Sequence, residues 1–403
     1  MALSFFTKQK QDESLVLLVD IGSASVGGAL VKIEKGSAPH ILVTVRENIS
    51  FQDALSPARF LVAMNRSLDK VLKTMQIKTN PVGLSQATKP TGLPAHIFCT
   101  LSSPWFILKS RHLRIAHQEE FEVTERILDE FINEDIALLK EELKETLPPK
   151  DVKIIEKKIV QIKLNGYEVR NPYGQKTSRI ELSMIVGVSS GKVVESIERK
   201  LSNFFHVKSV HFGAFPIAAF SAIRDIFPNE KNFLFIDITG EATDVSLVSN
   251  DILAGTVAFS RGKNFFIREI STQLHTVHEE AATLFAMFLR DELDAVQHSK
   301  IAAIVAHTED EWLMRFKKAI GILKGNGMLP FKVFFTADAD IAPMLSRLIG
   351  TTKLELLKAA SLDVQYLDQH IVAKFVSFEA EVTRDPFIVV EALLTEKLFK
   401  QHT

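Results

Sequence analysis

The chain has 403 residues, of which 46% are hydrophobic and 24% are charged, and its formal net charge is -1. This length exceeds what one hydrophobic core usually serves, so we expect a globular protein of two or more domains without a membrane-spanning segment. Basic and acidic residues are interspersed, which argues against nucleic acid as a partner, and the single cysteine, Cys99, excludes an internal disulfide and a cysteine-based metal site.

The start of the chain combines a polar segment with an apolar hairpin pattern. The first 14 residues lack the apolar stretch and cleavage site of a secretory signal, so we expect a cytoplasmic protein. Phe5 and Phe6 are candidates for contact with a membrane or a partner, with a disordered chain start as the alternative. An apolar run then ends in Asp20, a turn of Gly, Ser and Ala follows, and a second apolar run ends at Val31. This pattern predicts a strand-turn-strand hairpin.

The hairpin opens a predicted α/β half-domain. Residues 41–45 read as another strand, and residues 57–75 place apolar side chains at helical spacing after a Ser-Pro start. Residues 79–94 are rich in Pro, Gly, Ser and Thr, which is typical of an exposed connection. We expect this connection to lead into an inserted subdomain.

The predicted insert is an α+β subdomain at residues 96–190. It begins with a strand at 96–103 and continues with a helix at 124–143 that Thr124 caps. Two further strands are expected, at residues 157–164 and 179–188. The charges of the helix favour a solvated face over a binding site.

The hairpin pattern returns in the second half of the chain. After helices predicted at residues 192–202 and 215–226, residues 232–248 repeat it with Asp237 in the place of Asp20. One pattern used twice predicts two duplicated α/β lobes, and two unrelated hairpins are the alternative. We assign the first lobe to residues 14–95 and 191–228 and the second lobe to residues 229–403.

The last third reads as alternating strands and helices. The expected elements are a strand at 252–259, helices at 266–293 and 309–323, a strand at 332–335 and a helix at 341–349. A final helix at 387–400 is partly amphipathic and follows Asp385-Pro386 without a linker. We therefore expect it to close a domain rather than to lie on a membrane surface.

The two predicted turns have the composition of a phosphate site. A Gly-, Ser- and Thr-rich turn after a buried strand directs backbone N–H groups into a concavity that suits an anion. The candidate contacts are Gly22, Ser23, Ala24 and Ser25 in the first turn, and Thr239, Gly240, Glu241 and Thr243 in the second. Asp20 and Asp237 are candidates to hold Mg through water, because Mg prefers carboxylates, water and phosphate oxygens. Two such hairpins facing each other are expected to clamp a nucleoside triphosphate.

Together these elements resemble the actin-like ATPase superfamily, in which two duplicated α/β lobes close on ATP through two hairpins. Residues 165–174 (NGYEVRNPYG), followed by Arg179 and a strand, are similar to a stretch near the end of the SHS2-type insert of FtsA-like proteins. A simple type I or II turn is the alternative interpretation. On this resemblance we identify an FtsA-like member of the superfamily. PilM-like proteins are the nearest alternative, and Gly27 stands where these usually have a lysine.

The resemblance implies an ATP-binding cytoskeletal or scaffold protein of bacterial cell division, located at the inner face of the membrane. ATP and Mg are the implied ligands, Asp20 and Asp237 would position the metal and the attacking water, and at most a slow ATPase is expected. The implied partners are a tubulin-like division protein or inner-membrane assembly proteins, with self-association into filaments. A PilM-like protein of pilus assembly and a pseudo-ATPase interaction module are the alternatives, and a sugar or acetate-type kinase is disfavoured because no general base is evident.

Departures from the family pattern favour the pseudo-ATPase alternative. Glu241 places a carboxylate in a turn that normally approaches phosphates, where like charges repel. By register with the Ala-Glu-x-x-Lys helix of the family, Ala282 and Phe285 replace the acidic and basic residues that hold the nucleoside. Ala337 and Asp338 stand where the family has glycines that admit the ligand.

Overall fold

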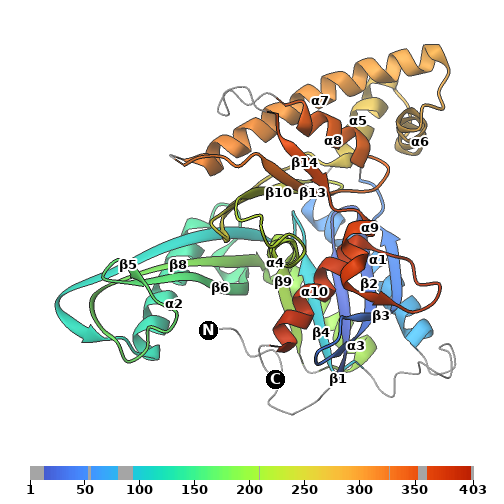
Figure 1. Cartoon of the computed structure of the whole chain (residues 1–403). Helices are drawn as coiled ribbons and strands as arrows, with labels where there is room; N and C mark the ends of the chain where they lie inside the picture. Colours follow the sequence, from blue (N-terminus) through green and yellow to red (C-terminus); the bar gives the residue numbers. More distant parts are fainter. Residues whose placement is uncertain are drawn as a thin grey trace. The chain divides into compact units, whose positions relative to one another are not determined.

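The computed structural model describes residues 13–52, 56–79, 94–207, 209–325, 327–352 and 361–400. Contacts divide the chain into two compact units (Figure 1). The smaller unit comprises Phe106–Ser196, and the larger unit comprises Ser4–Trp105 and Ile197–Thr403, as far as these residues are described. Phe5, Phe6 and most of the predicted connection at 79–94 lie outside the described residues.

A six-stranded sheet organises the first lobe of the larger unit. Its spatial order is β15 (Ser377–Phe378), β3 (His40–Asn48), β2 (Ser25–Glu34), β1 (Glu13–Ile21), β4 (His96–Leu101) and β9 (Val210–Ala214). β1, β2 and β3 form an antiparallel meander, and β4 and β9 continue the sheet parallel to β1. Nearly all of β1 is buried, as expected for a strand between two layers of helices.

A five-stranded sheet organises the second lobe and repeats this topology. Its spatial order is β12 (Ile252–Phe259), β11 (Thr243–Ser249), β10 (Phe233–Ile238), β13 (Lys332–Thr336) and β14 (Asp363–Tyr366). β10, β11 and β12 form the antiparallel meander, and β13 and β14 extend the sheet parallel to β10. The predicted duplication of hairpins and lobes is confirmed.

Helices cover both faces of the first sheet. α1 (Pro57–Thr79) packs on β2 and β3, and α10 (Pro386–Lys400) packs on β1, β2 and α4 (Phe215–Ile226). Two adjacent glycines of β2 show how closely each face of the sheet is covered. A Cβ at Gly28 would lie 2.7 Å from Val71 of α1, whereas a Cβ at Gly27 would lie 2.7 Å from Arg46, whose guanidinium contacts Phe387 of α10. α3 (Gly191–Phe205) lies beside α1, since Lys200 pairs with Asp69 at 2.6 Å.

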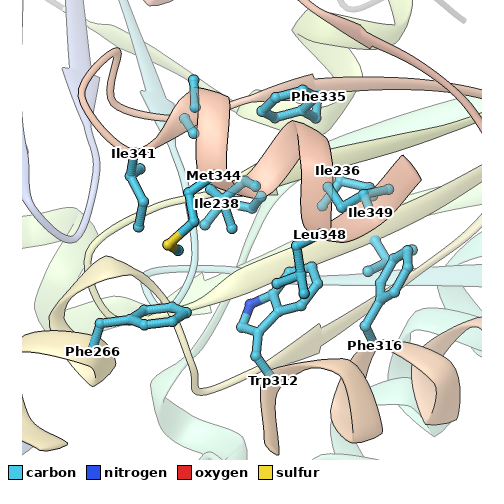
Figure 2. Packing of buried hydrophobic residues seen from close by; sticks show 14 of the residues in the cluster. Ile236, Ile238, Phe266, Trp312, Phe316, Phe335, Ile341, Met344, Leu348 and Ile349 are labelled. Atoms are coloured by element: carbon cyan, nitrogen blue, oxygen red, sulfur yellow. The ribbon is translucent and has the colours of Figure 1, made fainter. Parts of the chain in front are cut away.

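The second lobe has one large hydrophobic core on the helical side of its sheet. It is formed by α5 (Lys263–Leu274), α6 (His278–Leu289), α7 (Ala295–Lys324) and α8 (Ala342–Gly350) together with the sheet. Figure 2 shows Trp312 and Phe316 of α7 directed toward Leu348 and Ile349 of α8. This packing holds the second hairpin on a rigid base.

The smaller unit is a four-stranded antiparallel sheet with one long helix. Its order is β5 (Ile107–Glu122), β8 (Lys176–Ser190), β6 (Val152–Leu164) and β7 (Tyr167–Glu168), and α2 (Glu125–Glu142) packs on one face. The hydroxyl of Thr124 accepts a hydrogen bond from the Ile127 N–H, which confirms the predicted helix cap. Residues 165–174 hold two turns, with Gly166 and Gly174 at positive φ.

The observed units differ from the predicted domain boundaries at two places. Residues 96–101 were expected to open the insert, but they form β4 between β1 and β9, where an inner parallel strand is buried on both faces. Residues 377–400 were expected in the second lobe, but they form β15 and α10 of the first. Most of α10 is buried there, because its apolar side chains are covered by β1, β2 and α4.

Two further elements depart from the predicted pattern. The helical region expected at 266–293 is two helices, because His275 adopts a left-handed conformation (φ 54°) that ends α5. The 16-residue strand β5 was not predicted, since polar side chains interrupt its alternation. Among the described residues, no helix combines the length and apolar character needed to span a membrane.

Candidate functional site

The two predicted aspartates end equivalent strands, one in each lobe. Asp20 of β1 lies beside Thr100 of β4, and Asp237 of β10 lies beside Thr336 of β13. Both are buried, with 2% and 0% of their surface exposed. The charge of Asp20 raises the pKa of Asp237, so the two carboxyls are within electrostatic reach of each other.

Asp20 forms a buried ion pair with Arg46 of β3. The Nη2 of Arg46 lies 2.7 Å from Asp20, and its Nε lies 2.6 Å from Asp385. Its Nη1 donates to the hydroxyl of Ser25 at 2.8 Å, and the guanidinium lies over the ring of Phe387. Burial raises the pKa of Asp20, and the charge of Arg46 opposes that rise. Every arm of the guanidinium is therefore engaged inside the first lobe, and Asp20 has a protein cation as its partner.

Asp237 has no cationic partner among the described residues. Its Oδ1 accepts a hydrogen bond from Thr336 at 2.8 Å, and its Oδ2 is buried without a hydrogen-bond partner in the described part of the chain. Burial raises the pKa of Asp237 well above its ordinary value, and the charge of Asp244, directly opposite in the β10–β11 ladder, raises it further. Burial beside Asp244 therefore disfavours the ionised form of Asp237.

The two hairpin turns are joined by a relay of hydrogen bonds. The hydroxyl of Thr239 donates to the carbonyl of Ala242 at 3.0 Å, so the hydroxyl of Ser23, 2.7 Å away, donates to Thr239. Ser23 in turn accepts a hydrogen bond from the N–H of Glu241 at 2.8 Å. Ser23 of the first lobe thus satisfies an N–H of the second turn, in the position where a phosphate oxygen was predicted.

The turns also touch through their backbones. A Cβ at Gly240 would lie 2.9 Å from the Cβ of Ala24 and 3.1 Å from its backbone nitrogen. A glycine at this position permits the approach, and any side chain would push the turns apart. A phosphate group does not fit between atoms that are already in contact.

The N–H groups at the start of α5, the helix that follows the second meander, also bind within the protein. The first N–H groups of α5, those of Lys263 and Asn264, donate to the carbonyls of Thr239 and Gly240 at 3.0 and 2.8 Å. Free N–H groups at a helix start form a common phosphate site. Here the second turn occupies those of Lys263 and Asn264.

The other predicted turn residues have protein partners. The N–H of Gly22 donates to the Ser25 carbonyl at 3.0 Å, and the carbonyl of Gly22 accepts from the indole of Trp105 at 2.7 Å. The hydroxyl of Thr243 donates to the carbonyl of Arg261 at 2.7 Å. These contacts give the polar groups of both turns partners within the protein.

Glu241 is neutralised by an arginine that bridges the lobes. Its carboxylate accepts from Arg268 at 2.7 and 2.8 Å and from Asn264 at 2.7 Å. Arg268 also donates to the backbone carbonyl of Gln52 in the first lobe at 3.0 Å and lies 4.7 Å from the ring centre of Phe51. The predicted repulsion between Glu241 and a phosphate is replaced by an internal ion pair.

A second interlobe bond joins the loop after β4 to β11. The hydroxyl of Ser103 donates to Asp244 at 2.7 Å, and Asp244 is only 1% exposed. Burial raises the pKa of Asp244 to about 6, although the hydrogen bonds from Ser103 work against the rise. Asp244 is therefore expected to carry most of its charge at pH 7.

The predicted nucleoside positions hold no free polar groups. Phe285, which takes the place of the basic residue of the family, is 1% exposed and stacks on Phe266 at 5.6 Å. The ammonium of Lys263 lies 2.8 to 3.0 Å from Asp338 and Asp340 in the loop after β13. This pairing ties the loop to α5.

The residues present do not fit a Mg-triphosphate group. The turns contact each other, Asp20 is paired with Arg46, and burial raises the pKa of Asp237, which disfavours the ionised form that a metal ion needs. Within the described ranges, no three His, Cys, Asp or Glu side chains are grouped so as to hold a metal ion.

Three residues that carry these contacts were not predicted from the sequence. Arg46, Arg268 and Ser103 lie outside the two hairpin patterns, and each gains its partner only through the tertiary structure. One sequence signal bears on Arg46. Gly27 stands where the resemblance to PilM-like proteins implies a lysine, and the structure places Arg46 directly opposite it in the β2–β3 ladder.

Comparison with known proteins gives a similarity of structure without a similarity of sequence. No family model matches the sequence, and no curated protein sequence matches it. A chain of the PilM-PilN type IV pilus biogenesis complex superposes with a TM-score of 0.60 at 12% identity, covering 95% of this chain and 98% of that one.

Two weaker matches are also found. The ethanolamine utilization protein EutJ from Carboxydothermus hydrogenoformans gives a TM-score of 0.43 at 11% identity, covering 97% of this chain and 91% of that one. A Bacteroides thetaiotaomicron protein of unknown function, described as having an actin-like ATPase fold, gives 0.40 at 10% identity, covering 95% and 96%. With its duplicated sheets and the match to the PilM-PilN chain, this protein has the actin-like ATPase fold.

Proposed function

We propose that this protein is a protein-binding scaffold of a membrane-associated assembly, with a role like that of PilM in the pilus complex, and that it works without nucleotide. The observation that carries the proposal is the hydrogen-bonded contact between Ser23 and Thr239 at 2.7 Å. These residues belong to the two turns that would hold the phosphates, and they bind each other. The lobes are thus closed by the chain itself.

The chemistry of the two aspartates supports the same proposal. Asp20 is paired with Arg46, and burial together with the charge of Asp244 raises the pKa of Asp237 and so disfavours its ionised form. A catalytic site for phosphoryl transfer needs ionised carboxylates to position Mg and the attacking water. We propose no turnover, and the sequence-based expectation of ATP, Mg and a slow ATPase stays a prediction of the family resemblance.

The pilus-type role is favoured over the division role by the extent of the structural similarity. The match to the PilM-PilN chain covers 95% of this protein, including the smaller unit. The FtsA-like assignment, its SHS2-type insert and a tubulin-like partner rest on residues 165–174 and on Gly27, and they stay predictions. We propose an inner-membrane assembly protein as the partner and the inner face of the membrane as the location.

A binding experiment tests this function. The full chain is titrated with the cytoplasmic segment of an inner-membrane pilus assembly protein from the same genome, and separately with the tubulin-like division protein, each with and without millimolar Mg-ATP. We expect binding to the pilus protein only, with a dissociation constant that Mg-ATP leaves unchanged.

Two results would count against the proposal in different ways. Binding to the tubulin-like protein alone would restore the division role. A tenfold or larger change of affinity on adding Mg-ATP would show that nucleotide is coupled to partner binding and would refute the self-closed scaffold.

A further inference from the structure

One stretch of this nearly neutral chain is strongly basic. From Trp312 to Ala337 the sequence contains five basic residues and no Asp or Glu, although the whole chain has a net charge of -1. The basic residues are Arg315, Lys317, Lys318, Lys324 and Lys332. The stretch covers the C-terminal half of α7, the following loop and β13.

The structure separates this half of α7 into two faces. Trp312, Phe316 and Ile320 point into the core of the second lobe and are fully buried. On the outer face, Met314 is 58% exposed and Ile322 is 60% exposed. Large apolar side chains are therefore exposed to solvent on the face of α7 that does not pack into the core of the second lobe.

The loop after α7 continues this exposed apolar surface. Met328 is 92% exposed, whereas its neighbour Leu329 is buried in the core and fixes the loop to the lobe. Phe331 is 46% exposed. Met328 is thus held outward by an anchored segment.

Three lysines surround these apolar side chains with unpaired charge. Arg315 has Glu311 within 3.7 Å and Lys332 pairs with Asp363, but Lys317, Lys318 and Lys324 form no ion pair with any described residue. Lys317 and Lys318 are exposed and Lys324 is half-buried. Lysines beside exposed apolar side chains are typical of a surface that meets charged lipid headgroups. A protein interface core, in contrast, is depleted in lysine.

We propose that this surface docks on an anionic phospholipid membrane. We call it the α7 basic surface and define it by Met314, Lys317, Lys318, Ile322, Lys324 and Met328. The lysines approach the headgroups, and the apolar side chains enter the boundary between headgroups and acyl chains. The C-terminal helix α10 does not compete for this role, because it is mostly buried in the first lobe. The proposal holds whichever protein partner is bound.

Vesicle sedimentation of the full chain tests the proposal. With vesicles of phosphatidylglycerol and phosphatidylcholine at low salt we expect binding, with pure phosphatidylcholine none, and with rising salt a progressive loss. A triple variant, Lys317→Gln, Lys318→Gln and Lys324→Gln, is expected to lower the partition coefficient about 100-fold, at about fivefold per lysine. Met328→Ser is expected to lower it several-fold at any salt concentration.

A matched control has the same change in net charge elsewhere. Lys144→Gln, Lys150→Gln and Lys153→Gln replace three exposed lysines of the smaller unit and should leave binding within twofold of the unmodified chain. Absence of binding to phosphatidylglycerol vesicles at low salt would overturn the proposal and point to an acidic protein as the partner of this surface. Equal losses in both triple variants would overturn it too, because net charge alone would then explain binding.

Discussion

Gly27 and Arg46 face each other in the β2–β3 ladder, and the missing side chain of one makes room for the guanidinium of the other. A Cβ at Gly27 would lie 2.7 Å from Nη2 of Arg46, the atom that binds Asp20. The pair explains why Asp20 is held by a protein cation. A lysine at residue 27 would compete with Arg46 for the same carboxylate.

Replacing Gly27 with alanine should weaken this ion pair. The added methyl group displaces a guanidinium that is fixed by three partners, so we expect a loss of about 1–3 kcal/mol in the free energy of unfolding, as for other overpacked sites. Denaturant unfolding measures it. Gly321→Ala in α7 is the control, because nothing lies within 4 Å of its Cβ position, and it should stabilise by up to about 1 kcal/mol. Equal effects of the two substitutions would contradict the packing argument.

Removing the cation itself should have a larger effect. Arg46→Ala leaves Asp20 and Asp385 buried without their charge partner, which typically costs about 3–5 kcal/mol. Arg126→Ala breaks a solvent-exposed ion pair with Glu130 and should cost less than about 0.5 kcal/mol. The thermal unfolding midpoint distinguishes them. A midpoint of Arg46→Ala within 1 °C of the unmodified chain would show that the network is not structural.

Asp244→Asn should change the pH dependence of stability. Burial raises the pKa of Asp244 from 3.8 to about 6, so between these values the unfolded chain releases a proton that the folded chain keeps, and stability falls as pH rises. The asparagine variant lacks this loss and retains an acceptor for Ser103. The free energy of unfolding of the variant should therefore exceed that of the unmodified chain by an amount that grows from pH 4 to pH 6. This difference should reach about 3 kcal/mol and stay constant above pH 7.

Thermal unfolding midpoints from pH 4 to 8 check this prediction. Asp310→Asn, an exposed carboxylate on α7, is the control and should follow the curve of the unmodified chain. Parallel curves for Asp244→Asn and the unmodified chain would mean that the Asp244 carboxyl titrates normally.

The fold was largely predictable because its strongest signals are local. Two apolar runs that end in Asp-Ile gave both hairpins, and Thr124 gave the start of α2. β4 and α10 were placed in the wrong parts of the protein because their burial depends on partners distant in sequence. Nothing local shows that residues 377–400 return to the first sheet, where β15 pairs with β3.

The chemistry of the site was predicted less well for the same reason. The turn residues were found, and the structure brings Ser23 and Thr239 together. The contacts of Arg46, Arg268 and Ser103 with Asp20, Glu241 and Asp244 were not found, because these three residues meet the hairpins only after folding. The sequence signals against a nucleotide were Glu241 in the second turn, Ala282 and Phe285 in the predicted nucleoside helix, and Ala337 and Asp338 in place of glycines.

The interlobe contact should weaken when Arg268 is removed. Arg268→Ala deletes the ion pair to Glu241 and the bonds to Gln52, so the Glu241 amide, which donates to Ser23, should exchange its hydrogen at least about tenfold faster. Arg261→Ala is a close control, because Arg261 has a similar ion pair, to Glu311, and a similar ring contact within the second lobe alone. Hydrogen exchange measured by mass spectrometry on the peptide that contains the second turn distinguishes the two variants. Unchanged protection in Arg268→Ala would remove this residue from the interlobe contact.

The central claim is that the two hairpin turns bind each other and not a nucleotide. Thermal unfolding of the full chain with increasing Mg-ATP tests it most directly. A ligand at 100 times its dissociation constant would add about 2.7 kcal/mol of stability, so binding would be visible as a clear rise of the midpoint. We predict no shift of the unfolding midpoint, for the unmodified chain or for Asp20→Asn, with Mg-ATP at millimolar concentration and in tenfold excess over the protein. A concentration-dependent rise that Asp20→Asn or Asp237→Asn abolishes would contradict the account.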